Sequence, residues 1–228
     1  MAFDIRRLDD GDYEEDVFNE YQDELIELFA NSPEGQARAQ ADPGMGFWVA
    51  RLIDYGYSYA GTILTMMTED DVEELLTDVF PRKVSLNAPE EADDALPALI
   101  AFWEYLKREY NLSNADHILR YLRSVKPEQF RKWMNDSSRF GMAKSIFMMG
   151  RNAGFDMTDE KDSAAFINMY NANLLSSRQS DPSPALGDRE SDLSFTLGIG
   201  GGKKKADPKA KRRRKIAKES RKRNRKRK

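Results

Sequence analysis

The chain lacks cysteine altogether and contains a single histidine, His117. Without thiols it can form neither disulfides nor thiolate metal sites, which fits a reducing cytosol. One histidine cannot complete a metal-ligand set, and serines such as Ser137 have no other imidazole to act as their base. His117 lies between Asp116 and Ile118 in an expected helix, where a structural histidine, exposed or half-buried, is the favoured interpretation. We therefore predict a protein that is not an enzyme and holds no metal or cofactor.

Long apolar runs are also missing. No segment approaches the roughly 18 consecutive apolar residues that cross a membrane. The longest candidate, residues 44–67, is interrupted by Arg51, Asp54 and three glycines. The N-terminal sequence MAFD does not show the basic and then apolar pattern of a signal peptide. We expect a cytoplasmic protein without a membrane partner.

The sequence has no convincing strand signal, because no stretch of four to eight residues alternates apolar and polar side chains between turns. Apolar residues instead recur at spacings of three and four, as Phe18, Tyr21 and Leu25 do within residues 13–30, which is typical of an amphipathic helix. The length suits one domain, or one domain with a small appendage. We predict an all-α fold: a single multi-helix globular domain, then a disordered linker and a basic tail.

Prolines and capping residues set the expected helix ends in the first half of the domain. Residues 31–45 are rich in proline and glycine, so we expect turns there. Thr68, with an acid three residues later, forms a capping-box pattern that should begin a helix. Pro81 is expected to stop that helix, because proline disfavours the helical conformation of the residue before it.

Similar signals mark the second half. Asp136 or Ser137 is expected to cap a helix that ends before Gly154, a favourable glycine just past a helix C-terminus. Thr158 is expected to cap the last helix, which should run to about residue 175.

Charge is the most uneven property of the chain. Residues 203–228 contain 17 Lys or Arg and only two acids, Asp207 and Glu219, which gives this segment a net charge of +15. Because the whole chain carries −3, residues 1–202 sum to −18. A like-charge segment of this density cannot bury itself and repels itself into an open chain. The sequence predicts an acidic helical domain over residues 1–175 and a disordered basic tail over residues 203–228.

Residues 176–202 connect these two parts and are rich in Ser, Asp, Pro and Gly, the composition of a flexible linker. The run GIGGGK near its end is not a phosphate-binding loop. Leu197 stands where that motif requires its first glycine, and Lys204 stands where it requires Ser or Thr. The acidic clusters of the domain do not match the spacing of a calcium loop either. We predict a linker without a phosphate or metal site.

The segment RFGMAKS, residues 139–145, places two bases beside small residues. Gly141 and Ala143 indicate a close approach of neighbouring chain. Arg139 and Lys144 can pair with acids of the domain, which is the favoured interpretation, or mark an anion site near a helix start.

Three segments carry a resemblance to a known family: FPRKV at 80–84, APEEA at 88–92 and DSSRFGMAKS at 136–145. They resemble an uncharacterised all-helical module of bacterial proteins, over about residues 47–155. The resemblance implies a bacterial, helical protein. It implies no activity and no catalytic residue.

The tail has no aromatic residue, and Ile216 is its only large apolar side chain. It therefore cannot stack on bases as single-strand binders do, and we predict that it binds phosphates by charge and shape. Interleaved arginine and lysine suit folded RNA, because guanidinium forks grip phosphates bidentately. RNA or a ribosomal particle is the predicted partner, with DNA less favoured. The candidate nucleic-acid-binding residues are Lys203, Lys204, Lys205, Lys209, Lys211, Arg212, Arg213, Arg214, Lys215, Lys218, Arg221, Lys222, Arg223, Arg225, Lys226, Arg227 and Lys228.

Two other interpretations of the tail are open. The tail (+15) and residues 1–202 (−18) nearly cancel, so the tail can bind its own acidic domain or an acidic protein, which would make the chain a protein-interaction or adaptor module. Binding to anionic lipid is the weaker interpretation, because the tail has neither an apolar face nor a lipidation site.

Overall fold

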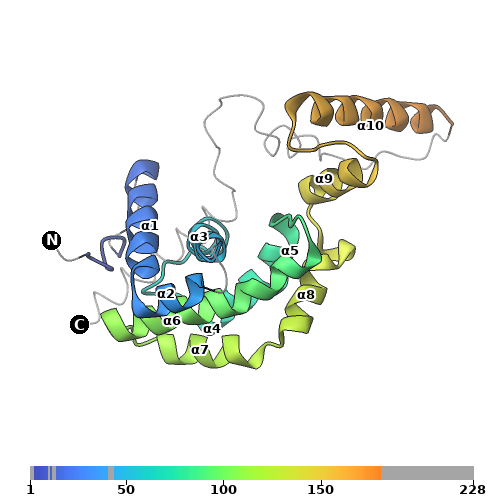
Figure 1. Cartoon of the computed structure of the whole chain (residues 1–228). Coiled ribbons are helices and arrows are strands. Elements are labelled where there is room, and N and C mark those ends of the chain that lie inside the picture. The colour runs from blue at the N-terminus through green and yellow to red at the C-terminus, as the bar shows by residue number, and fades with distance from the viewer. Residues whose placement is uncertain (1–2, 10, 12–13, 41–43, 181–228) are drawn as a thin grey trace, which may run out of the picture. The chain divides into compact units, whose positions relative to one another are not determined.

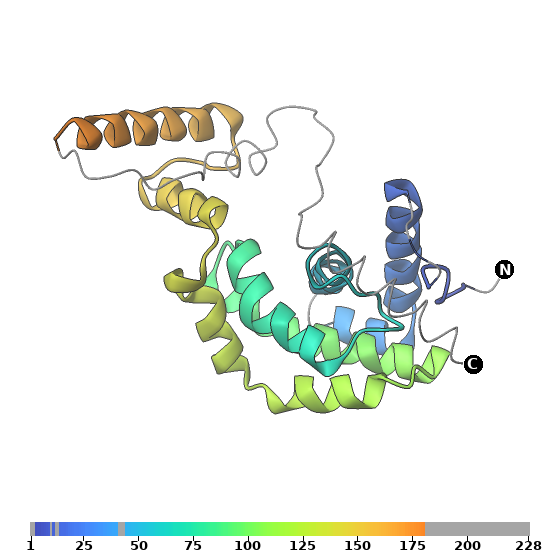
Figure 2. The same cartoon turned by 180° about the vertical axis from the view of Figure 1, so that it is seen from behind.

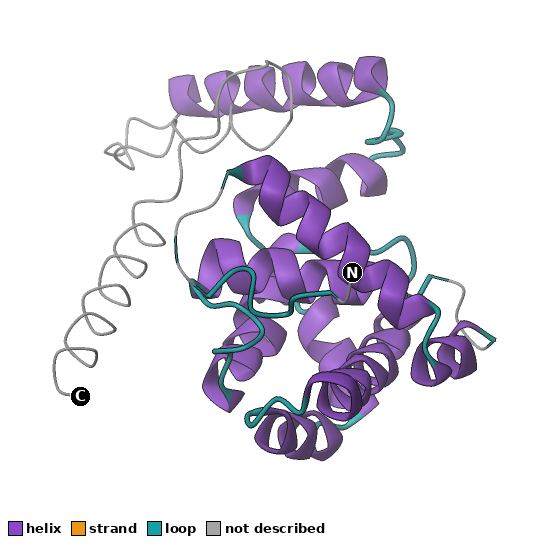
Figure 3. Ribbon diagram, turned by 90° about the vertical axis from the view of Figure 1, so that its left-hand side faces the viewer, coloured by secondary structure: helices purple, strands orange, loops and turns teal. Residues whose placement is uncertain are grey.

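The computed structural model describes residues 3–9, 11, 14–40 and 44–180 (Figure 1). Within these ranges every regular element is a helix and no strand occurs (Figure 3), so the predicted all-α fold is confirmed. The basic tail and residues 181–202 of the expected linker lie outside the described residues. Contacts divide the described chain into two compact units. Unit 1 is formed from the described parts of 1–81 and 86–136, and unit 2 from residues 82–85 and 137–180.

Unit 1 is a bundle of helices packed around α6 (Figure 2). Its helices are α1 (Glu15–Ala30), α2 (Pro33–Ala39), α3 (Gly46–Tyr55), η1 (Gly56–Ala60), α4 (Glu69–Glu74), η2 (Leu75–Val79), η3 (Pro89–Asp94), α6 (Ala95–Tyr110), α7 (Ala115–Ser124) and α8 (Pro127–Asn135). Helix α6 packs against α2, α3, α7 and η3. It is therefore covered on several sides, and eight of its 16 residues are buried.

Aromatic side chains join the outer helices of unit 1 to its core. Phe29 of α1 meets Phe102 of α6 edge to face, with ring centroids 5.3 Å apart. Trp48 of α3 meets Phe130 of α8 in the same way at 5.8 Å. Phe29, Phe102 and Phe130 are fully buried. Because each aromatic side chain removes about 150–250 Å² from water, these contacts are a large part of what holds the helices together.

The chain between α1 and α3 is helical in part, so the prediction of turns over residues 31–45 is wrong for α2. Ser32 supplies the N-cap of this helix: its hydroxyl accepts a hydrogen bond from the backbone N–H of Gly35 at 3.1 Å. Pro33 occupies the first helical position, where the missing N–H costs nothing. The composition of the segment indicated a turn, whereas the order of its residues is that of a helix start.

Pro81 does not stop the helix that begins at Glu69. The capping box at Thr68 is present as predicted. The helix then widens into a π-helical segment, η2, and continues as α5 (Phe80–Lys83). In η2 the backbone N–H groups reach back five residues, as that of Phe80 does to the carbonyl of Leu75. This widening precedes the residue that cannot donate, so proline is accommodated where an ideal α-helix would meet a clash.

Unit 2 is built from the chain segment Arg82–Ser85, η4 (Ser137–Arg139), α9 (Met142–Asn152) and α10 (Glu160–Ser180). Its small core is formed by Ile146, Met157 and Phe166, with partly buried aromatic side chains around them. The backbone N–H of Gly141 donates to the carbonyl of Arg82 at 3.1 Å. A Cβ on Gly141 would lie 2.9 Å from that oxygen. The close approach indicated by the small residue is therefore present.

Two predicted caps in this region are wrong, and one helix end is confirmed. The helix expected from Asp136 or Ser137 begins only at Met142, because a single 3-10 turn precedes it and Gly141 takes the N-cap position. Its C-terminal Gly154 has φ +89°, as a glycine in this position requires. At the start of α10 the carboxylate of Asp159, not Thr158, accepts hydrogen bonds from the N–H groups of residues 161 and 162.

Helix α10 continues to Ser180. Residues 176–180, expected at the start of the linker, are therefore helical. The expected domain over residues 1–175 comprises unit 1 and most of unit 2.

Candidate nucleic-acid interface

All 17 basic residues predicted to bind nucleic acid, Lys203 to Lys228, lie outside the described residues. They stay a prediction. What the structure adds is the electrostatic character of the domain to which this tail is attached.

The acids and bases of the domain are separated along the chain. Residues 1–94 contain 24 acids and six bases, whereas residues 101–151 contain five acids and ten bases. The domain is therefore not uniformly acidic. The summed charge of −18 over residues 1–202 conceals this separation, which a segment-by-segment count of the sequence would have found.

Helix α1 forms an acidic surface of unit 1. It carries six acids and no base, and all six are exposed. The guanidinium of Arg7 approaches this face, at 3.7 Å from the carboxylate of Glu20 and 3.6 Å from that of Glu24. We name this surface, residues 15, 16, 20, 23, 24 and 27, the α1 acidic face.

Ion pairs neutralise several bases of the second half of unit 1. Arg108 donates two hydrogen bonds to the carboxylate of Glu34, at 2.7 and 3.1 Å, and so lowers the pKa of Glu34. Arg131 pairs with Asp93, which raises the pKa of the arginine. Because these pairs join α6 to α2 and α8 to η3, they connect helices instead of presenting charge to a ligand.

Two further bases pair with acids at the surface. Lys107 lies 2.6 Å from Asp116 and lowers the pKa of that carboxyl. Arg123 lies 2.5 Å from Glu104. Exposed pairs of this kind contribute little to stability, but each one reduces the positive charge available on α6 and α7.

Three exposed cations are left on α7, on α8 and between them: Arg120, Lys126 and Lys132. Within the described chain none of these three takes part in an ion pair with an acid. Sequence reasoning missed them because it treated the domain as an acidic whole. The two helices are linked only by Val125 and Lys126, so the three cations lie on consecutive parts of the surface.

Lys144 in unit 2 is an exception among the lysines because it is buried, with 5% of its surface exposed. Its ammonium group lies over the ring of Phe140, 4.1 Å from the ring centre. Burial lowers its pKa to about 8. Arg139, the other base of the segment RFGMAKS, is exposed.

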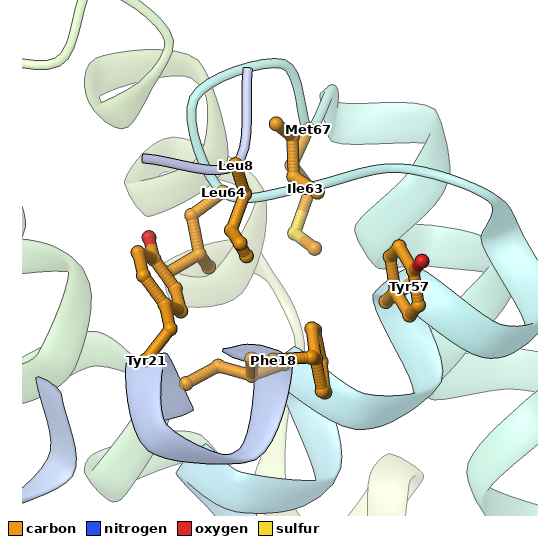
Figure 4. Close-up of a pocket in the computed structure, with 8 residues that line it drawn as sticks. Leu8, Phe18, Tyr21, Tyr57, Ile63, Leu64 and Met67 are labelled. Atoms are coloured by element: carbon orange, nitrogen blue, oxygen red, sulfur yellow. The ribbon is translucent and has the colours of Figure 1, made fainter. Parts of the chain in front are cut away.

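Unit 1 also contains a small apolar cavity between α1, the N-terminal segment and the chain around η1 (Figure 4). Phe18 and Tyr57, whose rings stack 4.5 Å apart, line it together with Met67 and other apolar side chains. The hydroxyl of Tyr21 donates to the carbonyl of Ile5 at 3.2 Å. The cavity has space for about one water molecule, which is too small for a metabolite.

In the part of the chain that the structure describes, no group of three or more His, Asp or Glu side chains is placed to hold a metal ion. Nor is any helix in these ranges long and apolar enough to cross a membrane. His117 is exposed on α7, in agreement with a surface position.

Comparison with known proteins returned no match of any kind: no family model, no curated protein and no solved structure is similar to this chain. The resemblance of residues 47–155 to an uncharacterised bacterial module therefore stays an expectation. Any functional argument depends on the chain itself.

Proposed function

We propose that this protein is a non-enzymatic, nucleic-acid-associated protein that binds RNA through its basic tail, residues 203–228, without sequence specificity. The observation that carries the proposal is the charge of this segment, +15 over 26 residues, on a chain whose other residues, 1–202, sum to −18. Each Lys or Arg that neutralises a phosphate releases a counterion, which favours binding to any polyanion.

The polarity of unit 1 supports this arrangement. The α1 acidic face is repelled by phosphates, so this side of the domain stays away from a bound nucleic acid and remains accessible to another molecule. The preferred partner is folded RNA in the bacterial cytoplasm, ribosomal particles included. Each guanidinium group can donate two parallel hydrogen bonds to an RNA phosphate, and the tail has no aromatic side chain for base readout.

The test is a binding titration of the full chain with a labelled mixed-sequence RNA hairpin and a duplex DNA of equal length, over a range of salt concentrations. If six to eight cations engage, log Kobs falls against log salt with a slope of about −4 to −7. Replacing all 17 bases of the tail by serine should abolish binding. A second variant, with the residues of the tail in scrambled order, should bind like the natural chain, because charge and not order carries the interaction.

Two results would show that the proposal is wrong. One is that the serine variant binds as tightly as the natural chain. The other is that the natural chain fails to bind RNA at 0.1 M salt. Stronger binding to duplex DNA than to RNA would keep the tail as the binding segment but replace the preferred partner.

The α1 acidic face favours a second candidate function, an adaptor whose tail binds its own domain or an acidic protein partner. Six exposed acids without a base on the same helix complement a segment of +15. Nuclease-treated protein should then be compact in small-angle scattering at low salt and expand as salt screens the attraction. Neutralising the six acids of this face should expand it at low salt, whereas neutralising six exposed acids on other helices should not. An expanded chain at low salt excludes this function.

A further inference from the structure

The outer surfaces of α7 and α8 carry three exposed cations that form no ion pair with an acid of the described chain. Arg120 lies on the exposed side of α7, whose opposite side is buried through Ile118, Leu119 and Leu122. Lys126 precedes α8 and Lys132 lies on its exposed side. Both helices run along the outer margin of unit 1 in the two opposite views of Figures 1 and 2.

An aromatic side chain accompanies these cations. On α8, Gln129, Lys132 and Trp133 are spaced by three and four residues, so they share one side of the helix. Trp133 is only partly buried, whereas Trp48 and Trp103 are 3% and 0% exposed. A partly exposed tryptophan next to a cation has the composition of a surface that stacks on bases and neutralises phosphates.

Acids limit the extent of this surface. Glu128 lies one helical turn before Lys132. Tyr121 also lies on α7, where burial, and then the nearby carboxylates of Glu73 and Glu69, raise its pKa to about 12. Tyr121 therefore faces acids, and we do not include it. The surface is defined by Arg120, Lys126, Lys132 and Trp133, and we name it the α7–α8 basic face.

We propose that the α7–α8 basic face is a second contact surface for RNA and that it takes an unpaired stretch, with Trp133 stacked on a base and the three cations on phosphates. This inference rests on the proposed function and deepens it. The tail cannot stack on bases, because it has no aromatic residue, whereas this face can. Helix α8 lies on the side of unit 1 away from α1, and α7 runs between them (Figures 1 and 2). RNA held by the tail therefore has a place on the domain where three cations can contact its phosphates.

The face variant Arg120→Gln, Lys126→Gln, Lys132→Gln tests the cations in the full chain. Three fewer contacts with a single strand should reduce the steepness of the log–log salt dependence by about 2, and lower affinity for oligouridylate at 0.1 M salt by up to about 100-fold. The matched control Arg6→Gln, Lys83→Gln, Lys161→Gln removes the same charge from exposed positions elsewhere. It should bind oligouridylate like the natural chain.

Trp133 has a readout of its own. Since the other two tryptophans are buried, oligouridylate should quench the fluorescence of Trp133 selectively, and an RNA duplex of equal length should not. Trp133→Leu should weaken oligouridylate binding at least about 5-fold, whereas Trp133→Phe, which keeps a stacking ring, should retain most of it. Equal unfolding temperatures of the variants and the natural chain show that the domain is intact.

The outcomes separate the two proposals. If the tail variant loses RNA binding while the face variant behaves like its control, the proposed function stands and the second surface is wrong. If the face variant and its control weaken equally, net charge and not this face is responsible, and the inference is again wrong. If the natural chain binds no RNA at 0.1 M salt, both proposals fail. Reduced affinity and a shallower slope in the face variant alone, with Trp133 quenching, support the inference.

Discussion

Gly35 gives the sharpest test of the packing in unit 1, because helix propensity and packing predict opposite signs for Gly35→Ala. The residue lies in the first turn of α2, under the end of α1. A Cβ there would lie 2.8 Å from the carbonyl carbon of Phe29 and 2.9 Å from Cα of Ala30, and closer still to the carbonyl oxygen of Phe29. All three atoms are backbone atoms, which cannot rotate away as a side chain can.

The magnitude follows from two opposed terms. Alanine is favoured over glycine inside a helix by about 1 kcal/mol. Forcing a methyl group into a closed space costs about 1–3 kcal/mol, and a backbone obstacle places Gly35 at the upper end. We expect a net loss of about 2 kcal/mol in the free energy of unfolding, or about 4–8 °C in Tm for a domain of this size.

The assay is urea and thermal unfolding followed by tryptophan fluorescence, since Trp48, Trp103 and Trp133 all lie in unit 1. Gly46→Ala is the matched control. A Cβ on Gly46, at the first position of α3, meets only the side chain of Ile26 at 3.5 Å, an ordinary contact. The control should change stability by less than about 0.5 kcal/mol. A Gly35→Ala variant as stable as the natural chain, or more stable, would refute the packing argument.

Three further substitutions follow from individual contacts. Thr68→Ala removes the capping box of α4 and should destabilise by about 1 kcal/mol in urea unfolding. An effect no larger than that of Thr77→Ala, whose hydroxyl donates to the carbonyl of Glu73, would contradict this. The side-chain amide of Asn114 donates to the carbonyls of Leu64 and Met67 at 2.9 and 2.7 Å. Asn114→Asp should destabilise more than Asn114→Ala, because a carboxylate there would face two acceptors. The reverse order in chemical unfolding would count against this argument. Lys144, with its pKa lowered to about 8, holds fewer protons in the folded than in the unfolded state between pH 8 and its ordinary pKa, so stability should rise with pH over this window. Contact with the ring of Phe140 offsets part of the cost of burying the charge, so we expect the rise in the free energy of unfolding to be about 1–2 kcal/mol. Lys144→Met should remove this rise between pH 7 and 9.5. If the pH profile of unfolding is unchanged in this variant, Lys144 is not its cause.

The sequence predicted the helical class well, because apolar residues at spacings of three and four report directly on the buried side of a helix. Phe18, Tyr21 and Leu25 are all buried as that pattern requires. Where single residues decide, the outcome was mixed. Thr68 caps its helix as predicted, but Thr158 does not, since the nearby Asp159 offers a carboxylate in the same role. Several neighbouring Asp, Ser and Thr residues compete for a cap, and only the backbone geometry selects one.

The π-helical segment before Pro81 could not have been predicted. Prediction from sequence patterns uses the period of an α-helix, and no residue pattern in 69–83 indicates a wider, π-helical turn. The Pro81 interpretation failed for this reason. The burial of Lys144 was also beyond prediction, because it depends on how Phe140 and α9 are placed.

Only part of the candidate interface could be predicted from the sequence. The basic tail was found from the sequence by counting charge. The three cations of the α7–α8 basic face could not be selected in this way, because Arg108, Arg123 and Arg131 look identical to them in sequence. In the structure, Arg108, Arg123 and Arg131 form ion pairs with the carboxylates of Glu34, Glu104 and Asp93, in that order.

The hydrogen bond between Gly141 and Arg82 has a consequence for the order of events during protein synthesis. Residues 82–85 belong to unit 2, but the remainder of that unit starts only at Ser137. At 5–20 residues per second, a ribosome needs about 3–12 s to add the chain between Arg82 and Gly141. During this interval the carbonyl of Arg82 cannot accept its hydrogen bond, because Gly141, which donates it, has not been synthesised. Unit 2 therefore cannot fold until residues 137 onward have been synthesised. In nascent chains stalled before Gly141, we expect water to solvate the carbonyl group of Arg82.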